Sequence, residues 1–100
     1  MLLLVALTLV HGSVRIGPTM PVCREGVPCT KPAAHVVLTF TRASSRVRVT
    51  TDAHGSYRVR LAAGAWMVRA SAGMRTTPFR VAVPQAVSWR RNFLLDSGIR

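Results

Sequence analysis

Acidic residues are scarce in this chain of 100 residues, which has only Glu25, Asp52 and Asp96 against fourteen basic residues. General acid–base catalysis commonly uses paired titratable groups in one site, and three carboxylates scattered along the chain do not supply such a pair. The histidines belong to no serine or cysteine nucleophile motif, and the sequence has no glycine-rich phosphate loop, HExxH helix or calcium loop. We therefore expect a protein that is not an enzyme and that carries no cofactor and no metal.

Long apolar runs are also missing. The longest, "MLLLVALTLV" from Met1 to Val10, is interrupted by Thr8 and has half of the roughly 20 residues that a transmembrane helix needs. Its length is typical of the apolar part of a secretory signal, although no basic residue precedes it and Val10-His11-Gly12 matches a cleavage site weakly. We interpret residues 1–12 as a signal peptide, complete or truncated at its start, of a secreted or extracytoplasmic protein with no stable transmembrane span. The alternative is a first core strand or helix.

Only two cysteines occur, Cys23 and Cys29, in "GPTMPVCREGVPCTKP", which is rich in proline and predicts an irregular loop. An even number of cysteines in an exported chain favours a disulfide between them. Free thiols in a cytosolic protein are the alternative. A redox or zinc site would need C-x-x-C spacing or four convergent ligands, and neither is present.

Apolar residues make up 49% of the chain, which excludes a disordered protein. No segment has the period of an amphipathic helix, and all six prolines lie between alternating segments. Seven such segments predict an all-β domain over residues 13–100, a seven-strand antiparallel β-sandwich: residues 14–16, 35–41, 46–51, 56–61, 65–70, 79–83 and 87–95.

The stretch "VRVTTDAHGSYRVRLAAGAWMVRA" predicts a hairpin with Asp52 and Gly55 at the first and last positions of a type I turn. In this register Val49 faces Val59 and Arg48 faces Arg60. The expected core residues are Val47, Val49, Tyr57, Val59, Leu61, Trp66 and Val68.

Thirteen of the fourteen basic residues are arginine, and the net charge of +11 favours anionic partners. The same skew is typical of coding bias in a GC-rich genome. The alternation places five arginines on one outward face: Arg46, Arg48, Arg58, Arg60 and Arg69. Because Arg48 opposite Arg60 would be a repulsive pair that an anion relieves, we hypothesise that this stripe docks the domain on an anionic envelope polymer, a lipid surface or an acidic protein. The alternative is an ordinary solvated sheet face.

A small basic nucleic-acid-binding protein is the alternative function. Single-strand binding uses exposed aromatic side chains among basic residues. Phe40, Tyr57, Trp66 and Phe79 have inward parity, which leaves Trp89 or Phe93 beside Arg90 and Arg91. Trp89, Arg91 and Phe93 share one parity, so the inward face of their strand is ambiguous, and a core position is favoured for Trp89.

The segment "VTTDAHGSYRVRLAAGAWMVRA" resembles the T-D-x-x-G-x-[FY]-x-[VF]-x-L-x-x-G-x-[YW] signature of carboxypeptidase regulatory-like domains, also called transthyretin-like or prealbumin-like domains. The matching residues are Thr51, Asp52, Gly55, Tyr57, Val59, Leu61, Gly64 and Trp66. The segments "GPTMPVCREGVPCTKPAAHVVLTF" and "NFLLDSGIR" resemble a group of small exported bacterial proteins with this domain, so that the resemblance covers most of residues 13–100. It implies an immunoglobulin-like or transthyretin-like sandwich and a non-catalytic accessory, adhesive or regulatory role. Members of that group often have cysteine where this chain has Met20, so the resemblance does not itself imply the Cys23–Cys29 pairing.

Overall fold

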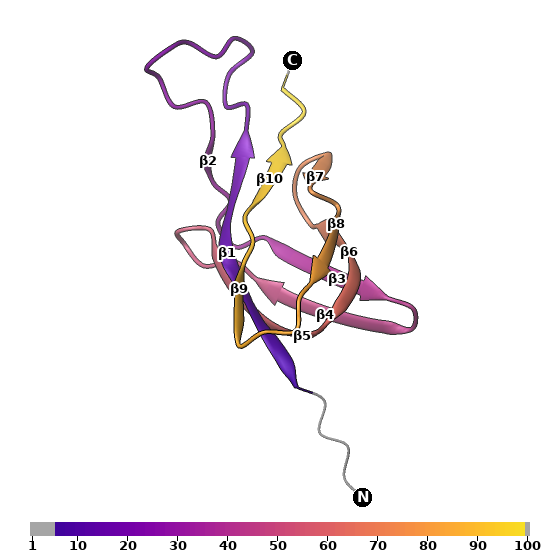
Figure 1. Ribbon diagram of the computed structural model, residues 1–100. Helices are drawn as coiled ribbons and strands as arrows, with labels where there is room; N and C mark the ends of the chain where they lie inside the picture. Colours follow the sequence, from indigo (N-terminus) through magenta and orange to yellow (C-terminus); the bar gives the residue numbers. More distant parts are fainter. Residues whose placement is uncertain (1–5, 100) are drawn as a thin grey trace, which may run out of the picture.

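The computed structural model describes residues 6–99. Over this range the chain is all-β, with ten strands and no helix, and the strands form one six-stranded and one four-stranded sheet (Figure 1). Because the described part has no helix, it contains none that is long and apolar enough to span a membrane.

The six-stranded sheet is built around one long strand, β1 (Leu7–Gly17). β1 pairs in antiparallel fashion with β2 (Lys31–Pro32) and β5 (Ser56–Ala62), and in parallel with β9 (Ser88–Arg90) and β10 (Phe93–Asp96). β7 (Arg75–Thr77) extends the sheet beyond β10. The predicted antiparallel arrangement is therefore wrong for this sheet, which is mixed.

The four-stranded sheet is entirely antiparallel and has the order β4 (Ser45–Thr50), β3 (Val37–Arg42), β6 (Gly64–Ala70) and β8 (Arg80–Val83). From β4 onward, each connection up to β9 takes the chain from one sheet to the other. Even β5 and β6, separated only by Ala63, belong to different sheets.

The inner faces of the two sheets share one apolar core. At its centre, the rings of Phe40, Tyr57 and Phe93 lie with centroids 5.7–6.3 Å apart, in tilted and edge-on arrangements that aromatic rings prefer. Five predicted core residues are buried, namely Tyr57, Val59, Leu61, Trp66 and Val68. Val47 and Val49 are only half-buried, because β4 is an edge strand with one neighbour.

Ten strands replace the seven that the alternation predicts. Two short strands, β2 and β7, carry too few residues to show a period, and the expected strand over residues 87–95 is divided into β9 and β10. The division lies opposite Gly12, where a Cβ atom would overlap the Arg91 carbonyl oxygen. Since only glycine leaves room for this approach, the backbone of Arg91 and Asn92 moves toward β1 and leaves the regular ladder.

The predicted hairpin is wrong in its pairing, although its turn has the expected geometry. Gly55 has a φ of 77° and donates to the Asp52 carbonyl oxygen at 3.0 Å, while the Asp52 carboxylate accepts from the backbone N–H groups of His54 and Ser56. However, β4 pairs with β3 and β5 pairs with β1, so the turn joins two sheets. The Gly55 carbonyl oxygen accepts from Val14 N at 2.7 Å, which holds the end of the turn against β1.

The expected export segment overlaps β1. Leu7 to Gly12 pair with β5, and Thr8 and Val10 are fully buried. Residues 7–12 therefore form part of a core strand, which is the alternative to a signal peptide. The expected boundary between the signal peptide and the domain, at residue 13, falls inside β1. Residues 1–5 lie outside the described range. Export itself stays a prediction.

The proline-rich segment between β1 and β2 is a loop that projects beyond the sheets (Figure 1). A disulfide joins Cys23 to Cys29 across it, with the Cα atoms 5.5 Å apart. The Arg15 guanidinium group anchors the base of the loop by donating to the hydroxyl and carbonyl oxygens of Thr30, each at 2.8 Å.

A candidate anion-binding groove

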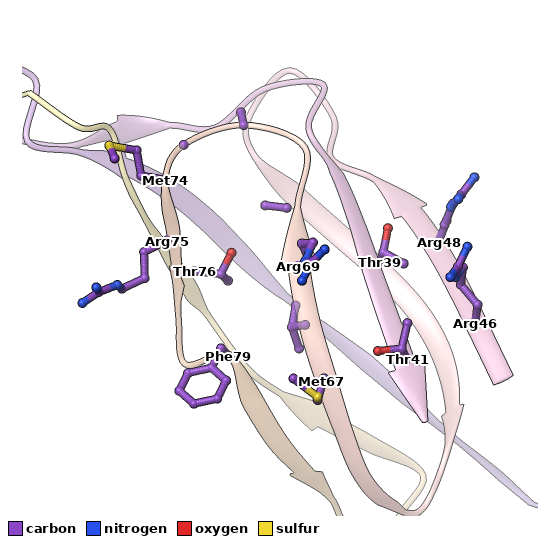
Figure 2. Close-up of a pocket in the computed structure, with 14 residues that line it drawn as sticks. Thr39, Thr41, Arg46, Arg48, Met67, Arg69, Met74, Arg75, Thr76 and Phe79 are labelled. Atoms are coloured by element: carbon purple, nitrogen blue, oxygen red, sulfur yellow. The ribbon is translucent and has the colours of Figure 1, made fainter. Parts of the chain in front are cut away.

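The outer face of the four-stranded sheet is hollowed into a groove with a volume of about 730 Å³. Strands β4, β3 and β6 form its floor, and the segment that leaves β6 and continues through β7 to Phe79 forms one wall (Figure 2). The groove lining includes Thr39, Thr41, Arg46, Arg48, Met67, Arg69, Met74, Arg75 and Phe79. We call this surface the basic groove.

A threonine between two arginines is the first feature of the floor. Thr39 on β3 is the cross-strand partner of Arg48 on β4 and of Arg69 on β6. Since neighbouring strands lie about 4.8 Å apart, the two arginine Cα atoms are about 10 Å apart with the threonine between them. Figure 2 shows the three side chains on the same side of the sheet. We call this set the Thr39 row.

A second row lies one pleat away along the same strands. Thr41 is the cross-strand partner of Arg46 and of Met67, and Met67 is in turn the partner of Arg80 on β8. Met67 is 49% exposed, so an apolar side chain lies beside the basic ones on the open face. The floor therefore offers guanidinium groups, hydroxyl groups and a flexible apolar side chain.

The wall adds two exposed apolar side chains, Met74 and Phe79, which are 76% and 55% exposed. The Arg80 guanidinium group lies over the Phe79 ring, 5.6 Å from its centroid, within the range of a cation–π contact. Arg75 points away from the arginines of the floor in Figure 2, and its cross-strand partner is Asp96 on β10.

No acidic side chain lines the basic groove, and the three acidic side chains of the sequence are all among the described residues. Glu25 lies in the disulfide loop and Asp96 on β10 of the other sheet. Asp52 lies in the turn, where hydrogen bonds from the backbone N–H groups of Ser56 and His54 lower the pKa of its carboxyl group. The positive charge on the floor is therefore not neutralised by acidic side chains in the groove.

The predicted single stripe of five arginines is corrected by the topology. Arg46, Arg48 and Arg69 line the basic groove, but Arg58 and Arg60 project from β5 on the outer face of the other sheet. Each arginine does point outward, as its parity indicates. The stripe is divided because β4 and β5 are not neighbours, and for the same reason Arg48 does not face Arg60.

Phe79, the exposed aromatic residue of the groove, has the inward parity that predicts a buried side chain, and this prediction is wrong. Its parity matches Val81 and Val83, but β8 begins at Arg80, and Phe79 lies where the chain passes from β7 in one sheet to β8 in the other. Alternation does not apply to such a crossing segment, and Pro78 is the sequence signal that marked it. By contrast, Phe93 is buried, and Trp89 is half-buried against the core with the Arg91 guanidinium group 5.9 Å from its ring.

The geometry does not indicate a metal centre: among residues 6–99, no three His, Cys, Asp or Glu side chains gather in one place. Burial raises the pKa of the Tyr57 phenol, and its hydroxyl donates to the backbone carbonyl oxygen of Arg91. The Cys23–Cys29 disulfide and the Asp52–Gly55 turn lie outside the basic groove. The groove presents guanidinium and hydroxyl donors, which are groups that can donate hydrogen bonds to anions.

Comparison with known proteins gives no match: no family model, no curated protein and no solved structure matches this chain.

Proposed function

We propose that this chain is a non-catalytic binding domain that holds an extended anionic polymer in the basic groove. The observation that carries the proposal is the Thr39 row, in which two arginines flank a hydroxyl group on a floor without carboxylates. Arginine remains charged at every physiological pH and presents several N–H donors in a planar fork. Two such forks beside one another repel unless an anion lies between them.

A tetrahedral oxyanion, phosphate or sulfate, suits the Thr39 row better than a carboxylate. Its several oxygens can accept from both guanidinium groups and from the threonine hydroxyl together, whereas a carboxylate has two oxygens, which a single fork can occupy. A polymer suits the groove better than a flat lipid surface, because the charges continue into the second row at Arg46 on the hollowed floor and at Arg80 on β8 beyond it.

The test is retention on immobilised polyphosphate at increasing salt concentration. Arg48→Ser with Arg69→Ser should lower the salt concentration at which the protein elutes, because exposed charges are screened over about 10 Å at 0.1 M ionic strength. Arg24→Ser with Lys31→Ser is the matched control, since it removes the same charge from exposed positions outside the groove. Equal elution of the two double variants would contradict the proposal.

Phe79 supports a second candidate, a single-stranded nucleic acid in the same groove. Its ring is 55% exposed beside Arg80, and bases stack on exposed aromatic side chains with about 1–3 kcal/mol per base. Phe79→Ala distinguishes the two candidates. If the groove binds a phosphate polymer without bases, Phe79→Ala should lower the affinity for polyphosphate and for an oligothymidylate by similar small factors. If it binds a single-stranded nucleic acid, the variant should lose tenfold or more of its affinity for the oligothymidylate alone.

We also propose that the chain works outside the cytoplasm as a domain of the carboxypeptidase regulatory-like, transthyretin-like type. Support comes from the all-β, two-sheet architecture and from the Cys23–Cys29 disulfide, since disulfides persist in oxidising compartments. Residues 7–12 complete β1, so the mature protein should retain them. Fractionation of producing cells tests the location, and a cytoplasmic protein would contradict it. The intact mass of the protein tests whether residues 7–12 are retained, and a mature chain beginning at residue 13 would contradict that.

A further inference from the structure

The outer face of the six-stranded sheet carries a second row of the same kind. His11 on β1 is the cross-strand partner of Arg58 on β5 and of Arg90 on β9, so that an imidazole lies between two arginines on three neighbouring strands. We call this set the His11 row. Arg58 and Arg90 are exposed and His11 is half-buried.

The His11 row lies in a shallow depression of about 510 Å³. Its lining includes the hydroxyl-bearing residues Ser13, Ser56 and Ser88 and, among the described residues, no carboxylate. Ser56 and Ser13 are cross-strand partners on the side toward the turn, and Ser88 lies one pleat away. Guanidinium, imidazole and hydroxyl donors therefore converge on this depression, which is the donor set that a phosphate or sulfate group takes.

Several other arginines of the described range are engaged within the protein. Arg15 and Arg42 donate hydrogen bonds to Thr30 and to the Ala63 carbonyl oxygen, and the Arg91 side chain packs on Trp89. The arginines of the two rows have no such hydrogen bond within residues 6–99. The arginines of the two rows thus form two uncommitted sets, one on each outer face of the molecule.

We propose that the His11 row is a second oxyanion site and that the domain is bivalent, joining two polyanion chains through its opposite faces. The core lies between the two sheets, so a chain bound at one row does not obstruct the other. The second site stands on its own geometry, whereas the bridging of two chains rests on the proposed function of the basic groove.

Binding stoichiometry tests the second site. Isothermal titration with inorganic tripolyphosphate at low salt should give two bound molecules per parent chain and one for Arg58→Ser with Arg90→Ser. The control pair Arg24→Ser and Lys31→Ser should still bind two. A parent stoichiometry of one, or two sites remaining in the Arg58/Arg90 variant, would overturn the proposal.

Bridging is tested with long-chain polyphosphate and, at matched charge, with dextran sulfate, which distinguishes phosphate from sulfate recognition. Light scattering should rise near charge equivalence for the parent and should be largely lost in Arg58→Ser with Arg90→Ser, although that variant still binds through the groove. If Arg48→Ser with Arg69→Ser leaves both tripolyphosphate sites intact, the function proposed for the groove fails. The second site is then judged separately, from the Arg58/Arg90 variant.

Discussion

The Tyr57 hydroxyl group on β5 donates a hydrogen bond of 2.5 Å to the carbonyl oxygen of Arg91, which directly follows β9 and lies before β10. This carbonyl oxygen lies where the parallel ladder with β1 is interrupted. A carbonyl group that is partly shielded from water needs a partner, and here the Tyr57 side chain supplies it. The bond therefore links the aromatic centre of the core to the interruption that Gly12 permits.

Removing this hydroxyl should destabilise the fold. We expect Tyr57→Phe to lower the free energy of unfolding by about 1–3 kcal/mol, because the ring still fills its site but the Arg91 carbonyl oxygen loses its donor. Urea denaturation followed by tryptophan fluorescence measures the change. An unchanged transition midpoint would mean that the carbonyl oxygen has another partner.

The same tyrosine predicts a loss of stability at alkaline pH. Burial raises the pKa of its phenol above the ordinary value of about 10, so that the unfolded chain releases the proton first. The stability associated with the neutral phenol is then fully present below about pH 10 and falls as the pH rises above it. In Tyr57→Phe this part of the decrease should be absent. Parallel alkaline titrations of thermal stability in both proteins check the sign.

Two glycines with nearly the same φ allow the cost of a left-handed backbone conformation to be measured separately from the cost of a steric overlap. Gly26 and Gly55 have φ values of 78° and 77°, but a Cβ atom at Gly26 would meet nothing within 4 Å, whereas at Gly55 it would lie 2.5 Å from the Val14 carbonyl oxygen. We expect Gly26→Ala to cost about 1–2 kcal/mol from the left-handed conformation alone. Gly55→Ala should cost a further 1–3 kcal/mol, roughly, from overpacking. Equal melting temperatures would contradict this.

The disulfide should stabilise the protein by restricting the unfolded chain. Closing a loop of this length contributes about 2 kcal/mol by the chain-entropy estimate. Cys23→Ser with Cys29→Ser should therefore lower the free energy of unfolding by about that amount, and reductant should lower the parent to the same value. Two alkylatable thiols in the parent without reductant would show that the bond does not form.

Alternation predicts which residues of this chain face the core, but not which strands are neighbours. Tyr57, Val59, Leu61, Trp66 and Val68 are buried as their parity indicates. The prediction of partners rests on the common tendency of successive strands to pair, and here most successive strands lie in different sheets. An alternating strand buries the same residues in either arrangement, so the hydrophobic pattern does not distinguish a hairpin from a crossing between sheets.

The sequence predicts only part of the candidate site, because alternation does not indicate which strands are neighbours. The outward direction of Arg48 and Arg69 follows from parity, whereas their placement on either side of Thr39 depends on β3 lying between β4 and β6. The His11 row depends on a parallel pairing between distant ends of the chain, with Arg90 beside His11. Local patterns contain no signal for such pairings.

A cross-linking experiment decides between the two arrangements of β4. In the structure Arg48 and Thr39 are cross-strand partners on one face, and such partners have Cβ atoms about 4.5–5.5 Å apart, close to what a disulfide spans after small adjustments. Thr39→Cys with Arg48→Cys should therefore form a disulfide under mild oxidation. Arg48→Cys with Arg60→Cys should keep two free thiols, because these positions lie on the outer faces of different sheets. Non-reducing alkylation followed by peptide mapping measures the thiols of both variants. A disulfide in the variant with cysteines at 48 and 60, together with free thiols in the variant with cysteines at 39 and 48, would establish the hairpin instead. It would also remove the Thr39 row on which the binding proposal depends.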